Sequence, residues 1–262
     1  MNILVLLKQV PDTTEMQIDK ETGTLIRAGV PTITNPDDLA GLEAALRLKD
    51  SMGAKVTCIT MGPPQAKNMM RELYAMGADE AIVLSDMKFS GADTWATSNT
   101  LAALIRTLEF DLIIAGRQAI DGDTAQVGPQ TAEKLGLPQI TYVDDIIAVK
   151  EGKIIVKKAL ESTYEIVEAP LPCVITTLST LASPRYMHVK GISHAFERDI
   201  KIMTFDDIQI DQSIIGLKGS PTKVKKTFTK EVHKNSDILH LDGKAAARKV
   251  FDIMVDFKFI GK

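Results

Sequence analysis

Apolar runs alternate with helical segments along the first half of the chain. Buried strands are predicted at residues 3–8, 55–61, 81–85 and 110–115. Helices are predicted at 36–52, 63–76 and 93–108, with a further one that starts between Asp123 and Pro129 and ends at Gly136. Strands that alternate with helices form parallel sheets covered on both faces. The predicted fold class is therefore α/β, a doubly wound and mostly parallel sheet.

The first predicted helix carries start and stop signals at its ends. Asn35 is placed as the N-cap, and Pro36 falls in the first turn, where a backbone N–H has no helical partner. The carboxylates of Asp37 and Asp38 complement the positive end of the helix dipole. Gly53 is expected to end the helix.

The pattern changes after Pro138. Residues 140–149 and 154–159 are predicted to pair as a β-hairpin, and residues 164–167 are expected to add a strand. Residues 173–177 read as a buried strand that rejoins the main sheet.

Two domains are predicted. Residues 1–200 form the α/β domain, with the hairpin inserted at about 140–170, and residues 201–262 form an extended C-terminal arm. Periodicity is lost from Ala182 until a final helix at about 243–255. An ordered arm with little core of its own usually packs on another chain.

Composition and charge exclude several function classes. The net charge of −3 gives no reason to expect nucleic acid as a partner, and no apolar run approaches the length of a membrane span. Residues 1–5 lack the basic start of a signal peptide and read as the first core strand. Cys58 and Cys173 lie in apolar runs, which indicates buried thiols and a cytoplasmic location.

Cysteine and histidine usage also limits the redox chemistry. Two isolated cysteines cannot hold an iron–sulfur cluster, no haem attachment motif is present, and the four histidines show no metal-ligand spacing. We expect no metal site and no catalytic side chain. An organic cofactor must carry any electrons that the protein transfers.

The segment 116–129 is the most distinctive candidate site. It follows an apolar strand and leads into a helix, and a polar, glycine-containing loop at this position is where open α/β sheets bind nucleotides. The end of the first strand, at Lys8, lacks the Gly-x-Gly-x-x-Gly pattern, so other strand ends must contribute. The alternative is a solvated connection that contains an Asx turn.

The loop residues have separable predicted roles. The backbone N–H groups of Gly122, Thr124 and residues 125–127 are expected to hold a diphosphate, helped by the Thr124 hydroxyl. Asp121 and Asp123 would repel phosphate, so they accept from ribose hydroxyls or cap the helix.

Other strand and helix ends supply further candidates with alternative roles. Arg117 approaches a flavin edge, pairs with a carboxylate or is a solvated surface side chain. Asn35 reads adenine or ribose, or caps its helix, and Lys8 is a ligand or only a strand-end charge. Asp93 and Thr94 form an N-cap pair near the same rim. The complete predicted cofactor set is Leu6, Lys8, Asn35, Met61, Gly62, Asp93, Thr94, Gly116, Arg117, Gln118, Asp121, Gly122, Asp123, Thr124, Ala125, Gln126 and Val127.

Several segments together resemble the β subunit of electron transfer flavoproteins. They are residues 5–12, 35–36, 61–64, 75–79, 116–129 and 156–176. Ser162 and Thr163 depart from the family, which usually has glycine or acidic residues there. The resemblance covers nearly all of the chain, and it implies an α-subunit partner onto which the C-terminal arm wraps.

The resemblance leaves two cofactors open. Ordinary electron carriers of the family hold AMP in this subunit, whereas the electron-bifurcating kind holds FAD. That FAD takes hydride from NADH and sends electrons to ferredoxin or flavodoxin and, through a second FAD on the α subunit, to a flavin-dependent dehydrogenase specific for acyl-CoA, lactate or a similar substrate. Residues 91–94 and 121–129 resemble the bifurcating kind, and Gly122 and the small Ala125 leave room for FAD. A second alternative is an ATP-binding α/β protein, although no Walker motif is present.

Residues 183–192 are the predicted contact surface for the dehydrogenase. Aromatic, methionine and arginine side chains in an irregular segment are typical of such surfaces, and in the family a loop at this place anchors the partner. The alternative is that Tyr186 and Val189 pack on the protein's own hairpin. The expected docking residues are Arg185, Tyr186, Met187, Val189 and Ile192.

Overall fold

The computed structural model describes residues 1–12, 31–225 and 238–260. The chain divides into two compact units, Met1–Lys226 and Thr227–Lys262. The division therefore falls after residue 226, not after residue 200 as predicted, because the segment beyond residue 200 adds a strand to the sheet of the first unit. Part of the predicted arm, residues 226–237 and 261–262, lies outside the described residues.

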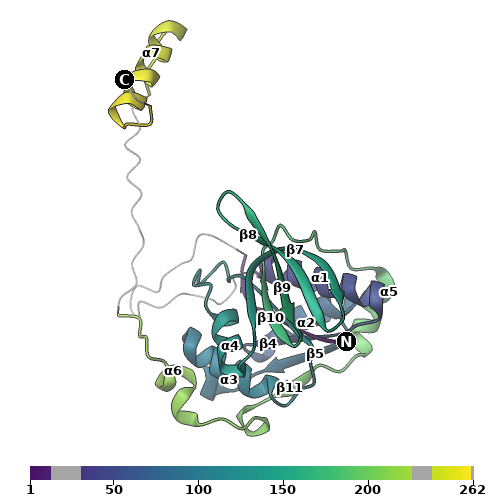
Figure 1. Ribbon diagram of the computed structural model, residues 1–262. Coiled ribbons are helices and arrows are strands. Elements are labelled where there is room, and N and C mark those ends of the chain that lie inside the picture. The colour runs from purple at the N-terminus through teal and green to yellow at the C-terminus, as the bar shows by residue number, and fades with distance from the viewer. Residues whose placement is uncertain (13–30, 226–237, 261–262) are drawn as a thin grey trace. The chain divides into compact units, whose positions relative to one another are not determined.

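A single large sheet organises the first unit (Figure 1). In the described part of the chain its strand order is β11 (Lys201–Met203), β5 (Glu80–Leu84), β4 (Lys55–Met61), β1 (Asn2–Leu6), β6 (Leu112–Gly116), β10 (Cys173–Thr177), β7 (Gln139–Lys150), β8 (Lys153–Ala159) and β9 (Tyr164–Pro170). All neighbours from β11 to β7 pair in parallel. The predicted α/β fold with a mostly parallel sheet is confirmed.

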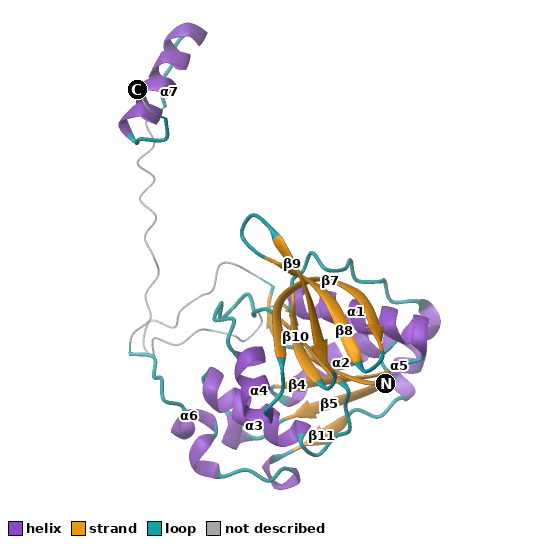
Figure 2. Cartoon of the chain, viewed as in Figure 1, coloured by secondary structure: helices purple, strands orange, loops and turns teal. Residues whose placement is uncertain are grey.

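The predicted hairpin is continuous with the sheet. Strand β7 pairs in parallel with β10 and antiparallel with β8, which in turn pairs antiparallel with β9 (Figure 2). Tyr142 has a positive φ of 59°, and the pairing register of β7 shifts at several positions. These irregularities allow one strand to serve both the parallel sheet and the meander.

Helices cover both faces of the sheet. Ile3 and Val5 of β1 pack in the cluster that contains α1, α2 and α5, whereas Leu4 and Leu6 pack in the cluster that contains α3 and α4. The alternation follows from the two-residue repeat of a strand, and it makes both faces of β1 apolar. The helices are α1 (Pro36–Met52), α2 (Lys67–Met76), α3 (Thr94–Ile105), α4 (Val127–Leu135), α5 (Val189–Glu197), α6 (Gly216–Gly219) and, in the second unit, α7 (Gly243–Asp256).

Short elements complete the architecture. Strands β2 (Gln9–Pro11) and β3 (Thr32–Thr34) form a separate antiparallel pair. Single 3₁₀ turns occupy η1 (Pro64–Ala66), η2 (Met87–Phe89), η3 (Phe205–Asp207) and η4 (Gln212–Ile214). The predicted helix at 63–76 therefore begins as a 3₁₀ turn and becomes α-helical at α2. Among the helices of the described ranges, none combines the length and the apolar character needed to cross a bilayer.

Candidate functional site

The carboxyl ends of β1 and β6 meet at a topological switch point. The two strands are parallel neighbours, with Leu6 opposite Ala115. The chain leaves β1 toward α1 on one face of the sheet and leaves β6 toward α4 on the opposite face. Ligands of open α/β sheets bind in the crevice that such a divergence opens. The segment that the sequence singled out, residues 116–129, begins at this point.

Asp38 joins the two strand ends. Its Oδ2 accepts from the Lys8 N–H at 2.7 Å, and its Oδ1 accepts from the Gly116 N–H and from Asn35 Nδ2, each at 3.0 Å. A Cβ on Gly116 would lie 2.1 Å from Asp38 Oδ1, so the close approach requires glycine. Asp38 was expected only to complement the helix dipole; this further role could not be predicted, because Lys8 and Gly116 are distant in sequence.

The buried environment of Asp38 disfavours the ionised form of its carboxyl. Burial raises the pKa of its carboxyl from 3.8 to about 7, although the hydrogen bonds from Asn35, Lys8 and Gly116 act in the opposite direction. The negative charge of neighbouring Asp37 adds to the increase. Protonation of this carboxyl near neutral pH would remove an acceptor from the junction of β1 and β6.

Asn35 supports the loop instead of capping α1. It stands at the N-cap position, but its side chain makes no capping hydrogen bond, so the predicted capping role is wrong. Its Nδ2 donates to the Gln118 carbonyl at 2.8 Å, and its Oδ1 accepts from the Ile120 N–H at 3.1 Å. The side chain is fully buried, and both of its polar atoms bind protein groups. Asn35 therefore holds the start of the loop in place.

Polar contacts fold the loop on itself. Lys8 Nζ contacts both carboxylate oxygens of Asp121, at 2.7 and 2.9 Å, and Gln118 Nε2 donates to Asp123 Oδ1. The N–H groups of Gly122 and Asp123 both donate to the Ala119 carbonyl, at 3.2 and 2.8 Å. The Gly122 N–H expected to hold a diphosphate thus has a partner within the loop.

The amides that follow are free to bind an anion. Within the described residues, the N–H groups of Thr124, Ala125 and Gln126 donate to no protein atom. Asp123 and Ala125 have positive φ values of 51° and 53°, and left-handed residues in a turn make successive N–H groups converge. A strained backbone beside a helix N-terminus is typical of a phosphate-binding loop.

The helix after the loop is not capped by either aspartate. Gln126 occupies the N-cap position of α4 and makes no side-chain capping hydrogen bond. The capping alternative for Asp121 and Asp123 is therefore wrong. The first turn of α4 begins at Val127 with its N–H groups directed toward the loop.

Arg117 is held against a buried carboxylate. Its Nε lies 3.4 Å from Asp37 Oδ2, and its guanidinium lies 5.7 Å from the Tyr142 ring centroid. The Nε and Oδ2 atoms are buried, and neither has a hydrogen-bond partner among the described residues. This arrangement matches the carboxylate-pairing alternative, and the solvated alternative does not apply, because the side chain is only 31% exposed.

The N-terminus of α3 forms the rim beside the loop. Thr94 Oγ1 donates to Gln126 Oε1 at 2.9 Å. Asp93 caps Ala96 with its Oδ1 and accepts from the Thr222 N–H and hydroxyl with its Oδ2. Although burial acts to raise the pKa of Asp93, these hydrogen bonds hold it below its ordinary value. Asp93 therefore acts as a structural cap, and Thr94 faces the loop.

The remaining predicted cofactor residues occupy neighbouring strand ends. Leu6 is buried at the end of β1, and Met61 ends β4, which is the next strand in the sheet. The Gly62 N–H donates to the Leu84 carbonyl of β5. The loop, the end of β1, the end of β4 and the start of α3 thus border one region of the sheet edge.

The predicted docking residues fall into two groups. Tyr186 and Val189 are 96% and 84% exposed, which excludes the alternative that they pack on the hairpin, and Met187 and Ile192 are also exposed. Arg185 bonds within the protein, to Glu43 and Asp50, and its expected role as a contact residue stays a prediction.

The described residues contain no cluster of metal-ligating side chains, and both cysteines are buried. In residues 1–12, 31–225 and 238–260, no group of three or more His, Cys, Asp or Glu could hold a metal ion. Cys58 and Cys173 are buried free thiols, and burial raises the pKa of both, that of Cys173 to about 11.

Comparison with known proteins agrees with this geometry. A family model described as the electron transfer flavoprotein domain matches residues 22–208. The chain belongs to the electron transfer flavoprotein family. It is 54% identical over 260 residues to the electron transfer flavoprotein subunit beta of Clostridium acetobutylicum, which covers 99% of this chain and 100% of the relative. The predicted resemblance to a β subunit of this family is confirmed.

Two further relatives are named as parts of larger complexes. The caffeyl-CoA reductase-Etf complex subunit CarD of Acetobacterium woodii is 54% identical over 231 residues, with 87% of this chain and 88% of the relative covered. The acryloyl-CoA reductase electron transfer subunit gamma of Anaerotignum propionicum is 46% identical over 238 residues, covering 87% and 88%. Two proteins similar to this chain are thus named as subunits of reductase complexes.

Proposed function

We propose that this β subunit pairs with an electron transfer flavoprotein α subunit and binds FAD in an NADH-linked, electron-bifurcating oxidoreductase complex. Electrons would leave toward ferredoxin or flavodoxin and, through FAD on the α subunit, toward a flavin-dependent dehydrogenase. The names of the two reductase-complex relatives support an acyl-CoA-type substrate for that dehydrogenase. The alternatives are AMP in an electron carrier and, less well supported, ATP.

The observation that carries the proposal is the set of amides at residues 124–126, which have no partner among the residues that the structure describes. They follow the left-handed Asp123, include the left-handed Ala125 and directly precede α4, which gives an anionic diphosphate both hydrogen-bond donors and a favourable dipole. The Thr124 hydroxyl is exposed and would add a donor. These groups suit the diphosphate of FAD and the phosphate of AMP alike.

The groups around the cradle would hold the rest of the cofactor. Lys8 at the loop entrance would contact phosphate or ribose, Asp121 would accept from a ribose hydroxyl, and Thr94 lies on the rim beside the loop. Arg117, fixed by Asp37 and Tyr142, would present its guanidinium to the flavin. When bound, FAD would supply hydride acceptance and one-electron transfer, and the chain's residues would bind and orient it.

Space beyond the adenosine favours FAD over AMP. A Cβ built on Gly122 meets no atom within 4 Å, so the tip of the loop is open. The side chain of Ala125 adds little bulk beside it. The tip of the loop therefore leaves room for a cofactor longer than AMP.

The flavin content of the purified αβ complex tests the proposal. We expect two flavins per heterodimer, bleaching of flavin by NADH without an electron acceptor, and reoxidation of the flavins when a flavin dehydrogenase accepts the electrons. One flavin together with one AMP would assign the complex to the ordinary carriers. A complex without flavin would favour the ATP alternative and overturn the proposal.

We further propose a cytoplasmic location and an α-subunit contact for the C-terminal arm. Two buried free thiols are typical of a reducing compartment. Helix α7 has no buried residue and exposes Val250 and Phe251, and Phe257 directly after the helix is also exposed, which supports burial of this face on another chain.

A further inference from the structure

We infer that Arg185 is a positioning residue that fixes the start of residues 186–197, here called the docking segment, on helix α1. The inference deepens the proposed function, because it takes this segment to be the site where the dehydrogenase binds. It replaces the expectation that Arg185 itself contacts the partner.

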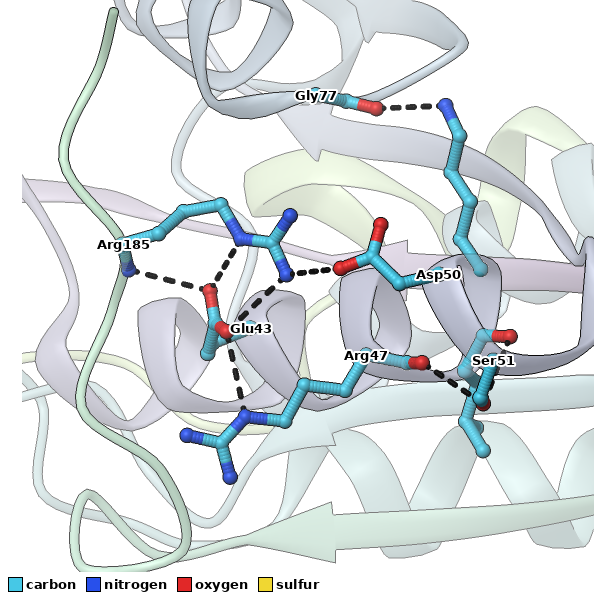
Figure 3. A network of polar contacts seen from close by, with 8 residues as sticks. Glu43, Arg47, Asp50, Ser51, Gly77 and Arg185 are labelled. Atoms are coloured by element: carbon cyan, nitrogen blue, oxygen red, sulfur yellow. Dashed lines mark hydrogen bonds and ion pairs between the residues drawn. The ribbon is translucent and has the colours of Figure 1, made fainter.

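Arg185 is bound to α1 through two carboxylates (Figure 3). Its backbone N–H donates to Glu43 Oε2 at 3.1 Å, and its Nε donates to the same oxygen at 2.8 Å. One terminal nitrogen donates to Glu43 Oε1 at 3.2 Å and to Asp50 Oδ2 at 2.8 Å. A forked guanidinium that spans two helical turns fixes both the direction and the position of the chain.

Arg185 keeps the buried Glu43 carboxylate charged. Its side chain is only 6% exposed, and burial alone would raise its pKa. The hydrogen bonds and charge of Arg185 outweigh that effect and hold the pKa of Glu43 below its ordinary value. Arg47 also bonds Glu43, at 3.3 Å, but it belongs to α1 itself and does not hold the docking segment.

The docking segment is also held at the start of α5 and just past its end. The His188 side chain caps α5 by accepting from the Gly191 N–H. A Cβ on Gly191 would lie 2.4 Å from the Ala75 carbonyl oxygen, so α5 rests directly on α2. The Tyr74 hydroxyl donates to the Asp199 carbonyl at 2.8 Å, just past the end of α5.

Around these contacts the docking segment exposes apolar side chains. Tyr186, Val189 and Phe196 are 96%, 84% and 69% exposed, and Met187 and Ile192 are partly exposed. A surface ordered before binding avoids part of the entropy that association would otherwise remove. Arg185 therefore contributes to docking by ordering the segment, and its guanidinium is already engaged with Glu43 and Asp50.

A double-mutant cycle in the αβ complex tests this role. The variants are Arg185→Gln, Glu43→Gln and the double variant, with Arg47→Gln as the matched control because it removes a Glu43 partner that does not reach the segment. The measurements are KM and kcat for reduction of a purified flavin acyl-CoA dehydrogenase assayed with crotonyl-CoA, and hydrogen exchange of residues 186–197 without the dehydrogenase.

We expect Arg185→Gln and Glu43→Gln each to raise KM by about tenfold at unchanged kcat and flavin content, and to speed exchange in the segment. The KM of the double variant should lie within about twofold of that of either single variant, since both single substitutions disrupt the same Arg185–Glu43 interaction. Arg47→Gln should change KM by less than about twofold. Should Arg185→Gln destabilise the complex, Arg185→Lys, which keeps the charge but loses the fork, replaces it.

Two results separate failure of this inference from failure of the proposed docking site. If the increases in KM of the two single variants multiply in the double variant and hydrogen exchange is unchanged, Arg185 contacts the dehydrogenase directly and the inference is overturned. Tyr186→Ala should raise KM without changing exchange. An unchanged KM in that variant would remove the docking segment as the dehydrogenase site, while the exchange data would still decide whether Arg185 orders it.

Discussion

The Asp38 side chain is buried and accepts three hydrogen bonds, so its pKa depends on the fold. Its donors come from the end of β1, the end of β6 and Asn35. The sequence places an aspartate in the first turn of a helix, which is common and uninformative. Its function arises only when distant segments converge, so no local pattern could have predicted it.

We expect the contribution of Asp38 to stability to decrease as pH rises from about 4 to about 7. Its pKa is 3.8 ordinarily and about 7 in the folded protein, so the folded state binds more protons in this interval and the unfolded state gains relative stability with pH. The measurement is the free energy of unfolding of the complex against pH, for the natural protein and for Asp38→Asn. An unfolding free energy of the natural protein that increases relative to that of Asp38→Asn as pH rises would contradict the prediction.

Ala125 stores backbone strain in the free loop. Its φ of 53° lies in the left-handed region, which glycine adopts without penalty. Ala125→Gly should therefore stabilise the complex against urea by up to about 1 kcal/mol. The control is Gly122→Ala, whose Cβ meets nothing within 4 Å and which should be nearly neutral. A loss of stability in Ala125→Gly would show that the left-handed conformation is not a source of strain.

At the scale of elements, glycine also sets how closely helices approach the sheet. A Cβ on Gly128 would lie 2.7 Å from Thr176 Cγ2, so α4 rests against β10 at this point. Gly128→Ala should displace the start of α4, destabilise the complex by about 1–3 kcal/mol and weaken cofactor retention. Urea unfolding and flavin release measure both effects.

The matched control for Gly128→Ala is Glu133→Ala, on the exposed face of the same helix. It should change stability by no more than about 0.5 kcal/mol. Equal effects of the two substitutions would mean that the contact between α4 and β10 does not position the loop.

Sequence patterns predicted most long elements because their signals are local. The buried strand at Lys55–Met61 and the helix ends at Gly53, Gly77 and Gly136 follow from apolar runs and from glycine at C-terminal caps. The short strand β11 and helix α5 were missed. Both are stabilised by packing against distant segments, β11 on β5 and α5 on α2, which no short pattern encodes.

Within the candidate site, the sequence predicted the position of the loop better than the roles of its side chains. The strand, loop and helix order around residues 116–129 follows from apolar and glycine patterns. The cap that Asp93 forms on α3 was predicted because its partner, Ala96, is local. The bonds from Asn35 to the loop, from Thr222 to Asp93 and from Arg185 to Glu43 join residues more than eighty positions apart in sequence. Such partners are known only from the fold.

At the scale of the whole molecule, the apolar face of α7 predicts how strongly the subunits associate. If that face packs on the α subunit, Phe251→Ser should raise the Kd of the heterodimer by at least about tenfold, because burial of a phenylalanine is worth about 1.5–3 kcal/mol. Phe251 is 56% exposed in the chain alone, so the substitution should leave the first unit folded.

The control for Phe251→Ser is Lys249→Ala, a charged neighbour on α7 whose removal should change the Kd by less than about twofold. Analytical ultracentrifugation of the mixed subunits measures both variants. An unchanged Kd in Phe251→Ser would show that this face of α7 serves a different partner.

Helix α1 touches both ends of the proposed electron route. Its N-terminal residues Asn35 and Asp38 hold the loop, and Glu43 and Asp50, farther along, hold Arg185. A helix rises about 1.5 Å per residue, so Asp38 and Glu43 are separated by roughly 7.5 Å along its axis. If the loop holds the cofactor and the docking segment binds the dehydrogenase, this one helix would set the spacing between the prosthetic group and the incoming redox protein, and inserting a residue into it would put the two out of register.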